Sequence, residues 1–304
     1  MEYVLETKAL SKQYRQFKAL NNLNMHVPKG AIYGFVGKNG AGKTTLIRLI
    51  TGLQKPTSGE YSIYGVRNVE RDAIKTRKRI GAVVETPSIY MDMTAEENLK
   101  AQFLTLGMPS YEGIRELLAL VGLKDTGTKK VKNFSLGMRQ RMGIAVALVG
   151  NPDFLILDEP VNGLDPQGII EIRELILKLN REMGITVLIS SHILDELSRI
   201  ATHYGFIDSG RMVKEISAEE LEASCRRKTV VTVSDTAAFA RSMDTLHIDY
   251  QITGDNSAEI YQEITVATLV DAAKMENCEI LTMHRQEESL ESFFMNLVGG
   301  GHNV

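Results

Sequence analysis

The sequence predicts an α/β fold of two domains, with buried parallel strands, a sheet edge and a helical subdomain in the first domain. An apolar run of strand length at 31–36 is followed by a glycine-rich loop and then by an apolar pattern of helical spacing that ends near Gly52. After Lys214 the pattern changes to short alternating runs and the charge changes sign. Residues 1–214 hold 29 Lys and Arg against 22 Asp and Glu, whereas residues 215–304 hold 6 against 16. We therefore expect one large domain and a small acidic α+β domain after it.

The middle of the first domain is expected to form a sheet edge and a helical subdomain. Short strands are predicted at 61–64, after the turn sequence KPTSGE, and at 80–84, and we expect both to build the edge of the sheet. Glycine, proline and aspartate then separate three apolar patterns of helical spacing, with no strand pattern between them. These patterns predict helices at 94–106, 111–121 and 136–149. A helical subdomain at about 87–150 follows.

The remaining elements alternate strands with helices. The unbroken apolar run at 154–157 predicts a buried parallel strand, 186–189 is its expected neighbour, and 168–183 is the expected crossover helix. The second domain is predicted to hold strands at 229–233 and 259–264 and helices at 237–246 and 268–276. The whole pattern is that of an α/β sheet with an appended α+β domain.

Composition narrows the class of protein but names no function. The chain is 43% hydrophobic and 24% charged, as is usual for a globular protein. The longest apolar stretches, such as the one around 144–149, are much shorter than the roughly 20 residues of a membrane-spanning helix. The first residues carry acidic groups and lack the apolar core of a signal peptide. We expect a cytoplasmic protein without a membrane span of its own.

The glycine-rich loop matches the phosphate-binding pattern G-x-x-x-x-G-K-[ST] in its required setting, after a strand and at the start of a helix. Backbone N–H groups of such a loop surround a nucleotide phosphate, Lys43 pairs with the β and γ oxygens, and Thr44 can bind Mg²⁺. A chance turn without a ligand is the alternative, and the context disfavours it. The expected nucleotide-binding residues are Gly37, Lys38, Asn39, Gly40, Ala41, Gly42, Lys43, Thr44 and Thr45.

Two acidic residues end the apolar strand FLILDEP. Asp158 is a candidate partner of Mg²⁺, in its second shell or through water, and Glu159 can act as the general base for an attacking water. A strand that ends in two acids also occurs by chance, so this motif gains weight from its position after the phosphate loop. A phosphate loop and two acids fit kinases, GTPases, recombinases and transporters alike.

The segment NFSLGMRQR, which begins at Asn133, resembles the signature motif LSGGQ-x-QR of the ABC ATPases. Further motifs follow the order of that family over residues 1 to about 214, and on their strength the chain is identified as a member of it. Tyr14 matches the adenine-stacking aromatic, Glu85 stands where the Q-loop glutamine is usual, Gly163-Leu164-Asp165-Pro166 matches the D-loop, and His192 matches the switch histidine. The resemblance implies a P-loop NTPase fold with a mixed sheet core and an antiparallel β edge, ATP as substrate and Mg²⁺ as cofactor.

The resemblance also implies that two chains share each ATP. In the family the signature residues, here Ser135, Leu136, Gly137 and Met138, contact the γ-phosphate of the ATP held by the other subunit. His192 would contact the same phosphate and tie it to Asp165 of the partner, with Glu159 as the catalytic base. From the residues alone, Ser135 could be a plain helix N-cap, His192 a structural histidine and Tyr14 a half-buried packing residue.

Three residues depart from the family pattern. Leu136 and Met138 replace the first glycine and the glutamine of the signature, and the serine and glycine that carry the phosphate contacts remain. Glu85 keeps an oxygen ligand for Mg²⁺ but loses an amide donor. A glutamate at this position resembles the subfamily that protects bacteria from lantibiotics and bacitracin-like peptides.

The leading hypothesis is the ATP-binding and ATP-hydrolysing subunit of an ABC transporter, which powers export or removal of an amphiphilic peptide antibiotic. Its expected partners are a second ABC subunit and a separate integral membrane permease, at the cytoplasmic face of the membrane, with no nucleic acid. One alternative is a soluble ABC ATPase that acts as a clamp or regulator on ribosomes or DNA. Such relatives usually carry two cassettes or a long coiled-coil insertion, and neither is present here. A nucleotide-dependent sensor whose acidic second domain binds a regulator is the other alternative.

Overall fold

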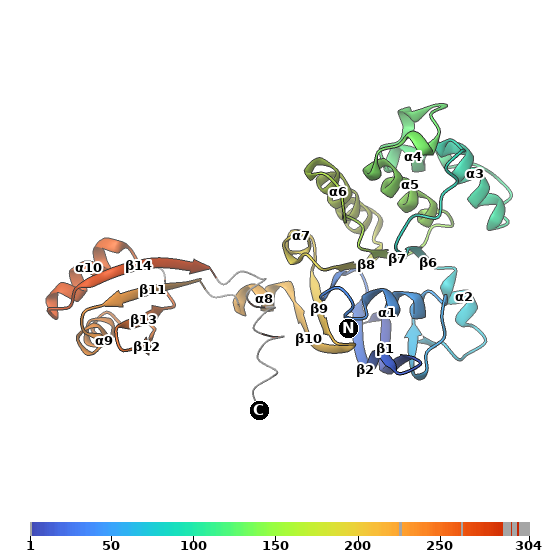
Figure 1. Cartoon of the computed structure of the whole chain (residues 1–304). Coiled ribbons are helices and arrows are strands. Elements are labelled where there is room, and N and C mark those ends of the chain that lie inside the picture. The colour runs from blue at the N-terminus through green and yellow to red at the C-terminus, as the bar shows by residue number, and fades with distance from the viewer. Residues whose placement is uncertain (1, 225–226, 263, 288–292, 294–296, 298–304) are drawn as a thin grey trace. The chain divides into compact units, whose positions relative to one another are not determined.

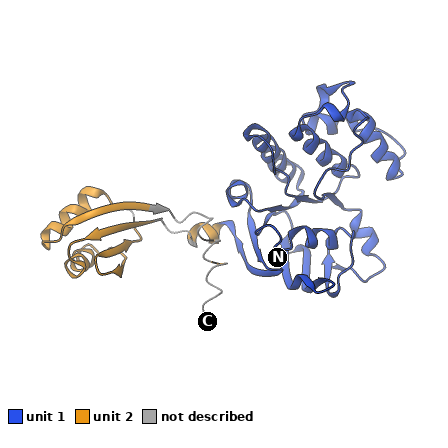
Figure 2. Ribbon diagram, viewed as in Figure 1, with its two compact units in different colours: residues 1–218 blue, residues 219–304 orange. Residues whose placement is uncertain are grey.

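The computed structural model divides the chain into two compact units, Met1–Ala218 and Glu219–Val304 (Figure 2). The structure describes residues 2–224, 227–262, 264–287, 293 and 297 (Figure 1). The unit boundary follows Ala218 rather than Lys214, because strand β10 (Arg211–Ser217) pairs along its whole length with β9 (His203–Asp208) of the first unit. The change in charge therefore precedes the structural boundary.

A six-stranded mixed sheet forms the centre of the first unit, in the order β10-β9-β3-β8-β7-β6. The strands β3 (Ile32–Val36), β6 (Ile80–Val83), β7 (Phe154–Asp158), β8 (Thr186–Ser191) and β9 run parallel, and β10 is antiparallel to β9. Every residue of β3, β7 and β8 is buried, which explains their unbroken apolar sequences. The strands predicted at 154–157 and 186–189 are parallel neighbours, with Leu155 opposite Val187.

A second, antiparallel sheet packs against the helix that follows the glycine-rich loop. It contains β1 (Tyr3–Tyr14), β2 (Phe17–Pro28), β4 (Ser58–Ile63) and β5 (Val66–Arg67) in the order β2-β1-β4-β5. One hydrophobic cluster joins residues of this sheet, of α1 (Lys43–Ile50) and of the central sheet. The expectation that 61–64 and 80–84 both build the edge of the sheet is confirmed for 80–84, which as β6 ends the central sheet, and is wrong for 61–64, which lies in this antiparallel sheet. Both runs are short and mainly apolar, so the sequence does not distinguish their sheets.

The helical subdomain contains the three predicted helices. They are α3 (Ala95–Thr105), α4 (Ile114–Leu120) and α5 (Leu136–Leu148), with single 3-10 turns at Lys124–Thr126 and Val131–Asn133. Figure 1 shows these helices grouped together, beside the edge of the central sheet that β6 forms. Helix α3 begins with a capping box, in which Thr94 and Glu97 each accept a backbone hydrogen bond from the other residue. Helices α2 (Ala73–Arg77), α6 (Pro166–Met183) and α7 (Leu194–Ser198) complete the unit.

A half-buried carboxylate ties the last strand of the first unit into the centre of the fold. Glu215 of β10 accepts a hydrogen bond of 2.6 Å from the hydroxyl of Tyr33 in β3. Its other oxygen lies 2.9 Å from Nδ1 of His26 in β2. Burial raises the pKa of the Tyr33 phenol well above its ordinary value, and the charge of Glu215 adds to the rise. Strands from both sheets of the first unit therefore meet at Glu215.

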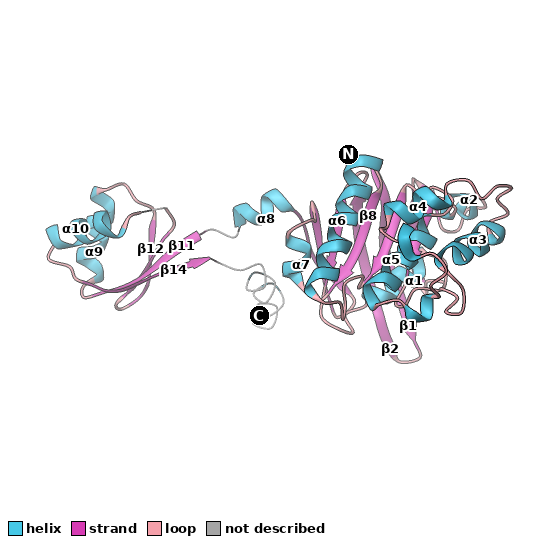
Figure 3. Ribbon diagram, turned by 90° about the horizontal axis from the view of Figure 1, so that it is seen from above, coloured by secondary structure: helices cyan, strands magenta, loops and turns pink. Residues whose placement is uncertain are grey.

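The second unit is a small α+β domain with four antiparallel strands. Helix α8 (Ala218–Ser224) leads into β11 (Arg227–Val233), α9 (Thr236–Thr245), β12 (Tyr250–Gly254), β13 (Ser257–Ile260), α10 (Val266–Met275) and β14 (Ile280–Glu287). The sheet order is β12-β13-β11-β14, which with this element order is a ferredoxin-like arrangement. Figure 3 shows α9 and α10 against one face of the sheet, where a separate hydrophobic cluster lies. The strand predicted at 259–264 is shorter than expected, because β13 ends at Ile260 before the N-cap Thr265 of α10.

Within the part of the chain that the structure describes, no helix is both long enough and apolar enough to cross a bilayer.

Candidate nucleotide-binding site

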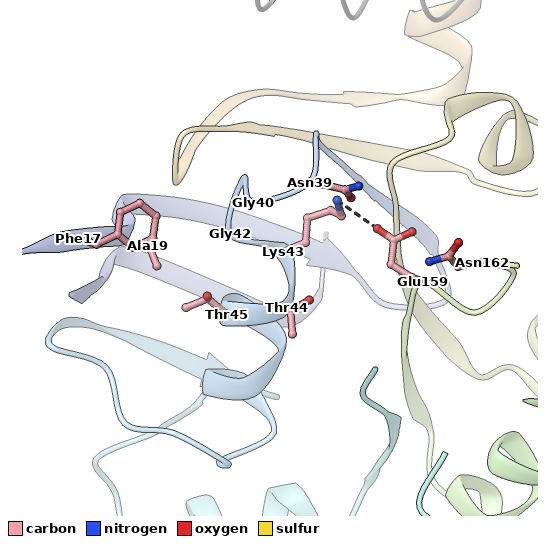
Figure 4. A pocket seen from close by; sticks show the side chains of 10 residues that line it. All are labelled: Phe17, Ala19, Asn39, Gly40, Gly42, Lys43, Thr44, Thr45, Glu159 and Asn162. Carbon is pink, nitrogen blue, oxygen red and sulfur yellow. Dashed lines mark ion pairs between the residues drawn. The ribbon is translucent and has the colours of Figure 1, made fainter. Parts of the chain in front are cut away.

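A cavity of about 300 Å³ lies between the glycine-rich loop and the segment that follows β7. Figure 4 shows Lys43 at its centre, with Phe17 and Ala19 on one side and Glu159 and Asn162 on the other. The residues that line the cavity are Phe17, Ala19, Asn39, Gly40, Gly42, Lys43, Thr44, Thr45, Glu159 and Asn162. Six of these ten belong to the loop that the sequence identified.

Two glycines explain the shape of the loop. Gly42 has a φ of +113°, and a Cβ there would lie 2.6 Å from the carbonyl oxygen of Ala19. A Cβ on Gly37 would lie 2.6 Å from the carbonyl oxygen of Ile207 in β9. Gly42 is also the N-cap of α1 and provides no side chain to that helix. The first N–H groups of α1 therefore lack a side-chain cap and point toward the cavity end of the helix, which suits an anion.

Lys43 is a buried cation with several partners. Its side chain is only 6% exposed, and Nζ lies 3.1 Å from Oε1 of Glu159. The same nitrogen donates hydrogen bonds to the carbonyl oxygens of Gly37 at 2.6 Å and Lys38 at 3.3 Å. A buried ammonium must be paired in this way because desolvation is costly. Phosphate oxygens in the cavity could replace Glu159 as its anionic partner.

Asp158 has one satisfied and one unsatisfied oxygen. The residue is 1% exposed, and its Oδ1 accepts a hydrogen bond of 2.6 Å from the hydroxyl of Ser190 in β8. Its Oδ2 is buried and lacks a hydrogen-bond partner among the described residues. A buried carboxylate oxygen requires a donor or a cation, and hard oxygen ligands suit Mg²⁺. Asp158 therefore fits the expected metal, together with the hydroxyl of Thr44 on the cavity wall.

Glu159 connects the phosphate loop with His192. Its Oε2 lies 2.8 Å from Nδ1 of His192, while its Oε1 pairs with Lys43. Its backbone φ is +50°, an uncommon value for a residue with a side chain, and its N–H donates to the hydroxyl of Ser190 at 3.0 Å. Lys43, Glu159 and His192 thus form one chain of polar contacts that begins at the cavity wall.

Glu196 in α7 adds a second acid to this group. One of its oxygens is buried and has no partner among the described residues. Burial raises the pKa of Glu196 above its ordinary value, His192 opposes the rise and the charge of Glu159 adds to it. The sequence analysis missed Glu196, although its position four residues after His192 was a usable signal.

Tyr14 and Glu85, both expected at the nucleotide, lie outside the cavity wall in this structure. Tyr14 donates a short hydrogen bond to Oε1 of Gln54, and the aromatic ring on the wall is that of Phe17, its partner across the β1–β2 turn. Glu85 forms an ion pair of 2.5 Å with Arg48 and lines a different cavity. Phe17 was missed because two aromatic residues at one hairpin turn look equivalent in the sequence.

The signature residues also lie away from the cavity wall. Ser135 is the N-cap of α5 and accepts a hydrogen bond of 3.2 Å from the backbone N–H of Met138. Leu136 is 50% exposed, and Gly137 faces the start of α6, where Asp165 caps the helix through the N–H of Gly168 at 3.0 Å. Of the described residues on the cavity wall, none comes from α5. A single chain thus does not bring the signature to its own phosphate loop.

These features define a P-loop NTPase: a mixed, mainly parallel sheet, a glycine-rich loop between β3 and α1, and an acidic end of β7. Comparison with known proteins narrows the class. The chain belongs to the ABC transporter family, whose model matches residues 20–162. It is accordingly an ATP-binding subunit of an ABC transporter and an ATPase.

Two relatives are ATP-binding proteins of bacitracin and lantibiotic transport. The bacitracin transport ATP-binding protein BcrA of Bacillus licheniformis is 41% identical over 99% of this chain and 99% of its own length. The lantibiotic transport ATP-binding protein SrtF of Streptococcus pyogenes is 44% identical over 70% of this chain and 90% of its own. Among solved structures, the dimeric post-hydrolysis state of the cassette MJ0796 with ADP and Pi has a TM-score of 0.63 and 26% identity, covering 70% of this chain and 98% of that one.

Proposed function

We propose that the chain powers the removal of an amphiphilic peptide antibiotic of the bacitracin or lantibiotic type, through a permease supplied by another chain. The observation that carries this proposal is the identity of 41% to a bacitracin transport subunit over nearly the whole length of both chains. The glutamate at position 85 agrees with it. The alternative of a clamp on ribosomes or DNA is not favoured by relatives that are transport subunits.

The residues of the cavity would divide the work of hydrolysis. Lys43 and the N-terminus of α1 would bind the β and γ phosphates, and Phe17 or Tyr14 would stack on the adenine. Thr44, Asp158 and, once its loop has moved, Glu85 would hold Mg²⁺, which neutralises phosphate charge when it is bound. Glu159 would accept a proton from the attacking water, and His192 would hold the Glu159 carboxylate in place and contact the γ-phosphate.

Two chains would be needed for a complete site. Ser135 and Gly137 are exposed or half-exposed at the start of a helix and lie off the cavity wall, so they are available to a second copy. A head-to-tail dimer with two ATP molecules at its interface agrees with the dimeric assembly of MJ0796. We expect this dimer to work at the cytoplasmic face of the membrane, bound to its permease.

Co-purification and drug protection together test the proposal. The tagged chain, expressed in its native host and extracted with mild detergent, should bring an integral membrane protein with it. Cells should lose protection against bacitracin or a lantibiotic when Lys43 is replaced by alanine, and keep it with the exposed-lysine control Lys29→Ala. Recovery of ribosomes in place of a membrane protein, or equal drug sensitivity of the two variants, would contradict the proposal.

A further inference from the structure

A second cavity, of about 530 Å³, lies beside the loop that follows β6. Its walls come from the end of α1, the end of β6, that loop and the middle of α5. The lining residues used below are Arg48, Glu85, Pro87, Ser88 and Gly143. Of these, none lines the nucleotide cavity. The two cavities nevertheless share helix α1, because Lys43 is its first residue and Arg48 lies in its last turn.

Arg48 and Glu85 form the only polar contact that the structure gives the Glu85 carboxylate among the described residues. Nη2 of Arg48 lies 2.5 Å from Oε1 of Glu85, with side chains 35% and 55% exposed. Glu85 has a φ of +60°, a backbone conformation that costs free energy for a residue with a Cβ and persists only where the surroundings hold it. The ion pair is therefore one of the contacts that fix this loop.

The loop is also in close contact with the signature helix. A Cβ on Gly143 of α5 would lie 2.5 Å from Cβ of Pro87, two residues after Glu85. A Cβ on Gly81 of β6 would lie 2.3 Å from the carbonyl oxygen of Ala147, so α5 also approaches the strand itself without an intervening side chain. Packing at this distance transmits displacement, because close-packed interiors are not compressible. A shift of Glu85 must therefore move Pro87 against α5, the helix that Ser135 caps.

We propose that Arg48 is a positioning residue, which holds Glu85 outside the nucleotide cavity and, through Pro87 and Gly143, sets the position of the signature helix. This inference rests on the proposed function insofar as Glu85 acts at Mg²⁺ and the attacking water. Hydrolysis then requires that the Arg48–Glu85 pair opens. An exposed ion pair is weak enough to open in each cycle and strong enough to change the balance between two loop positions about twofold to fivefold.

Steady-state kinetics with ATP tests the positioning role. Arg48→Ala should raise kcat by about twofold to fivefold with KM for ATP unchanged, because Arg48 does not line the nucleotide cavity. Arg48→Lys, which keeps a cation, should return kcat toward the wild-type value. In a Glu85→Gln background, Arg48→Ala should have no further effect, since the pair is already broken. The matched control is Arg67→Ala. Arg67 is an exposed arginine of β5 that forms an ion pair of 2.9 Å with Glu70.

A fluorescent reporter follows the loop without relying on hydrolysis. The chain contains no tryptophan, so Ser88→Trp introduces a single tryptophan on the wall of the second cavity, which can be excited selectively over the tyrosines. We expect its emission to shift when Mg²⁺ and ATP are added. With Arg48→Ala, the emission before nucleotide is added should already lie closer to the ATP-bound value, whereas with Arg67→Ala it should match the parent.

Several results would overturn the inference. These are a lower kcat for Arg48→Ala, a change in KM alone, additive effects of Arg48→Ala and Glu85→Gln, or a reporter that ignores Arg48→Ala. A failure of the proposed function can be distinguished from a failure of this inference. If only the proposed function is wrong, drug protection will be absent while the kinetic and fluorescent effects of Arg48→Ala persist. Thermal melting of Arg48→Ala and Arg48→Lys identifies a variant that fails to fold, and the lysine variant keeps the kinetic test decisive.

Discussion

The phosphate loop and the start of the signature helix are both junctions of a loop with a helix N-terminus, but they are completed differently. Helix α1 begins after Gly42, which has no side chain to cap it, and the cavity with Lys43 and Glu159 lies at that end. Helix α5 begins after Ser135, whose hydroxyl accepts the N–H of Met138, and no acidic side chain occupies its first turn. The N-terminus of α1 therefore already faces charged side chains of its own chain, Lys43 and Glu159. The N-terminus of α5 has only a cap and is open to another molecule.

This difference teaches that anion-binding geometry alone does not identify a site. Both N-termini offer N–H groups and positive potential to an anion. Only α1 combines them with a buried cation, two carboxylates and a cavity in the same chain. If the two chains of a dimer combine the two N-termini around one phosphate, variants at α1 and α5 should both lose hydrolysis but should complement each other.

The largest effect is expected at α1. Lys43→Ala removes the buried ammonium that would bind the β and γ phosphates, and ATP hydrolysis should fall by about 100-fold or more. The variant also leaves Glu159 without its cationic partner, so melting must be measured beside turnover. Phosphate release by the purified chain, with Lys29→Ala as the control, provides the measurement. Unchanged turnover would show that the cavity is not the ATP site.

Glu159→Gln should lower hydrolysis by about 100-fold or more while ATP still binds, because the amide cannot accept a proton from water. Two chains with ATP between them should then stay together. Sedimentation with and without Mg²⁺ and ATP should reveal a shift from the monomer to the dimer. If turnover stayed at the wild-type level, the general base would have to be sought elsewhere, with Glu196 the nearest candidate on electrostatic grounds.

Ser135→Ala tests the other half of the comparison. Loss of the N-cap costs about 1 kcal/mol of stability, and loss of the hydroxyl should also impair hydrolysis by a partner chain. A random mixture of Ser135→Ala and Lys43→Ala chains should regain up to about a quarter of the wild-type activity, because each mixed dimer holds one intact site. Thr94→Ala, which removes the N-cap of α3 in the same subdomain, is the control for stability. Without complementation, the signature does not act on a partner's ATP.

The smallest effect is expected at Glu196, which lies near the cavity but not on its wall. Because its folded-state pKa is raised above the ordinary 4.5, its contribution to stability is present below that pH and is lost as pH rises through the folded-state value. The ionised group is therefore unfavourable in the folded state at pH 8. Glu196→Gln should raise Tm at pH 8 by less than about 2 °C, and the gain should shrink toward pH 5. A lower Tm at pH 8 would mean that a charge contact of Glu196 outweighs its burial.

Much of the fold follows from the sequence because its strongest patterns are local. The strand, loop and helix around Gly37 to Thr45, the buried strand before Asp158 and the three helices of the subdomain all occur where periodicity and glycine predict them. Pairing of distant strands is not local. The sequence does not reveal that 61–64 and 80–84 enter different sheets, because each is a short run whose partners lie elsewhere in the chain.

The candidate site was predictable to the extent that its residues lie in contiguous motifs. The loop residues and Glu159 meet at one cavity, and His192 and Asp158 lie next to them. The partner of Glu85 was not predictable, since a contact between the end of α1 and the loop after β6 depends on how two elements pack. Phe17 and Glu196 had sequence signals of position only. Phe17 lines the nucleotide cavity and Glu196 has a buried carboxylate oxygen. Both properties depend on how the chain folds and not on the local sequence.

The attachment of the second unit has a consequence for how such chains diversify. The first unit ends on β10, the terminal strand of its sheet, which is held from within by Glu215. A segment joined after a terminal strand interrupts no hydrogen-bonded ladder and no buried cluster of the ATPase. We therefore expect genetic addition, loss or exchange of a C-terminal domain to leave the ATPase unit intact. Selection can refit that domain to a new regulator or cargo without having to re-evolve ATP hydrolysis.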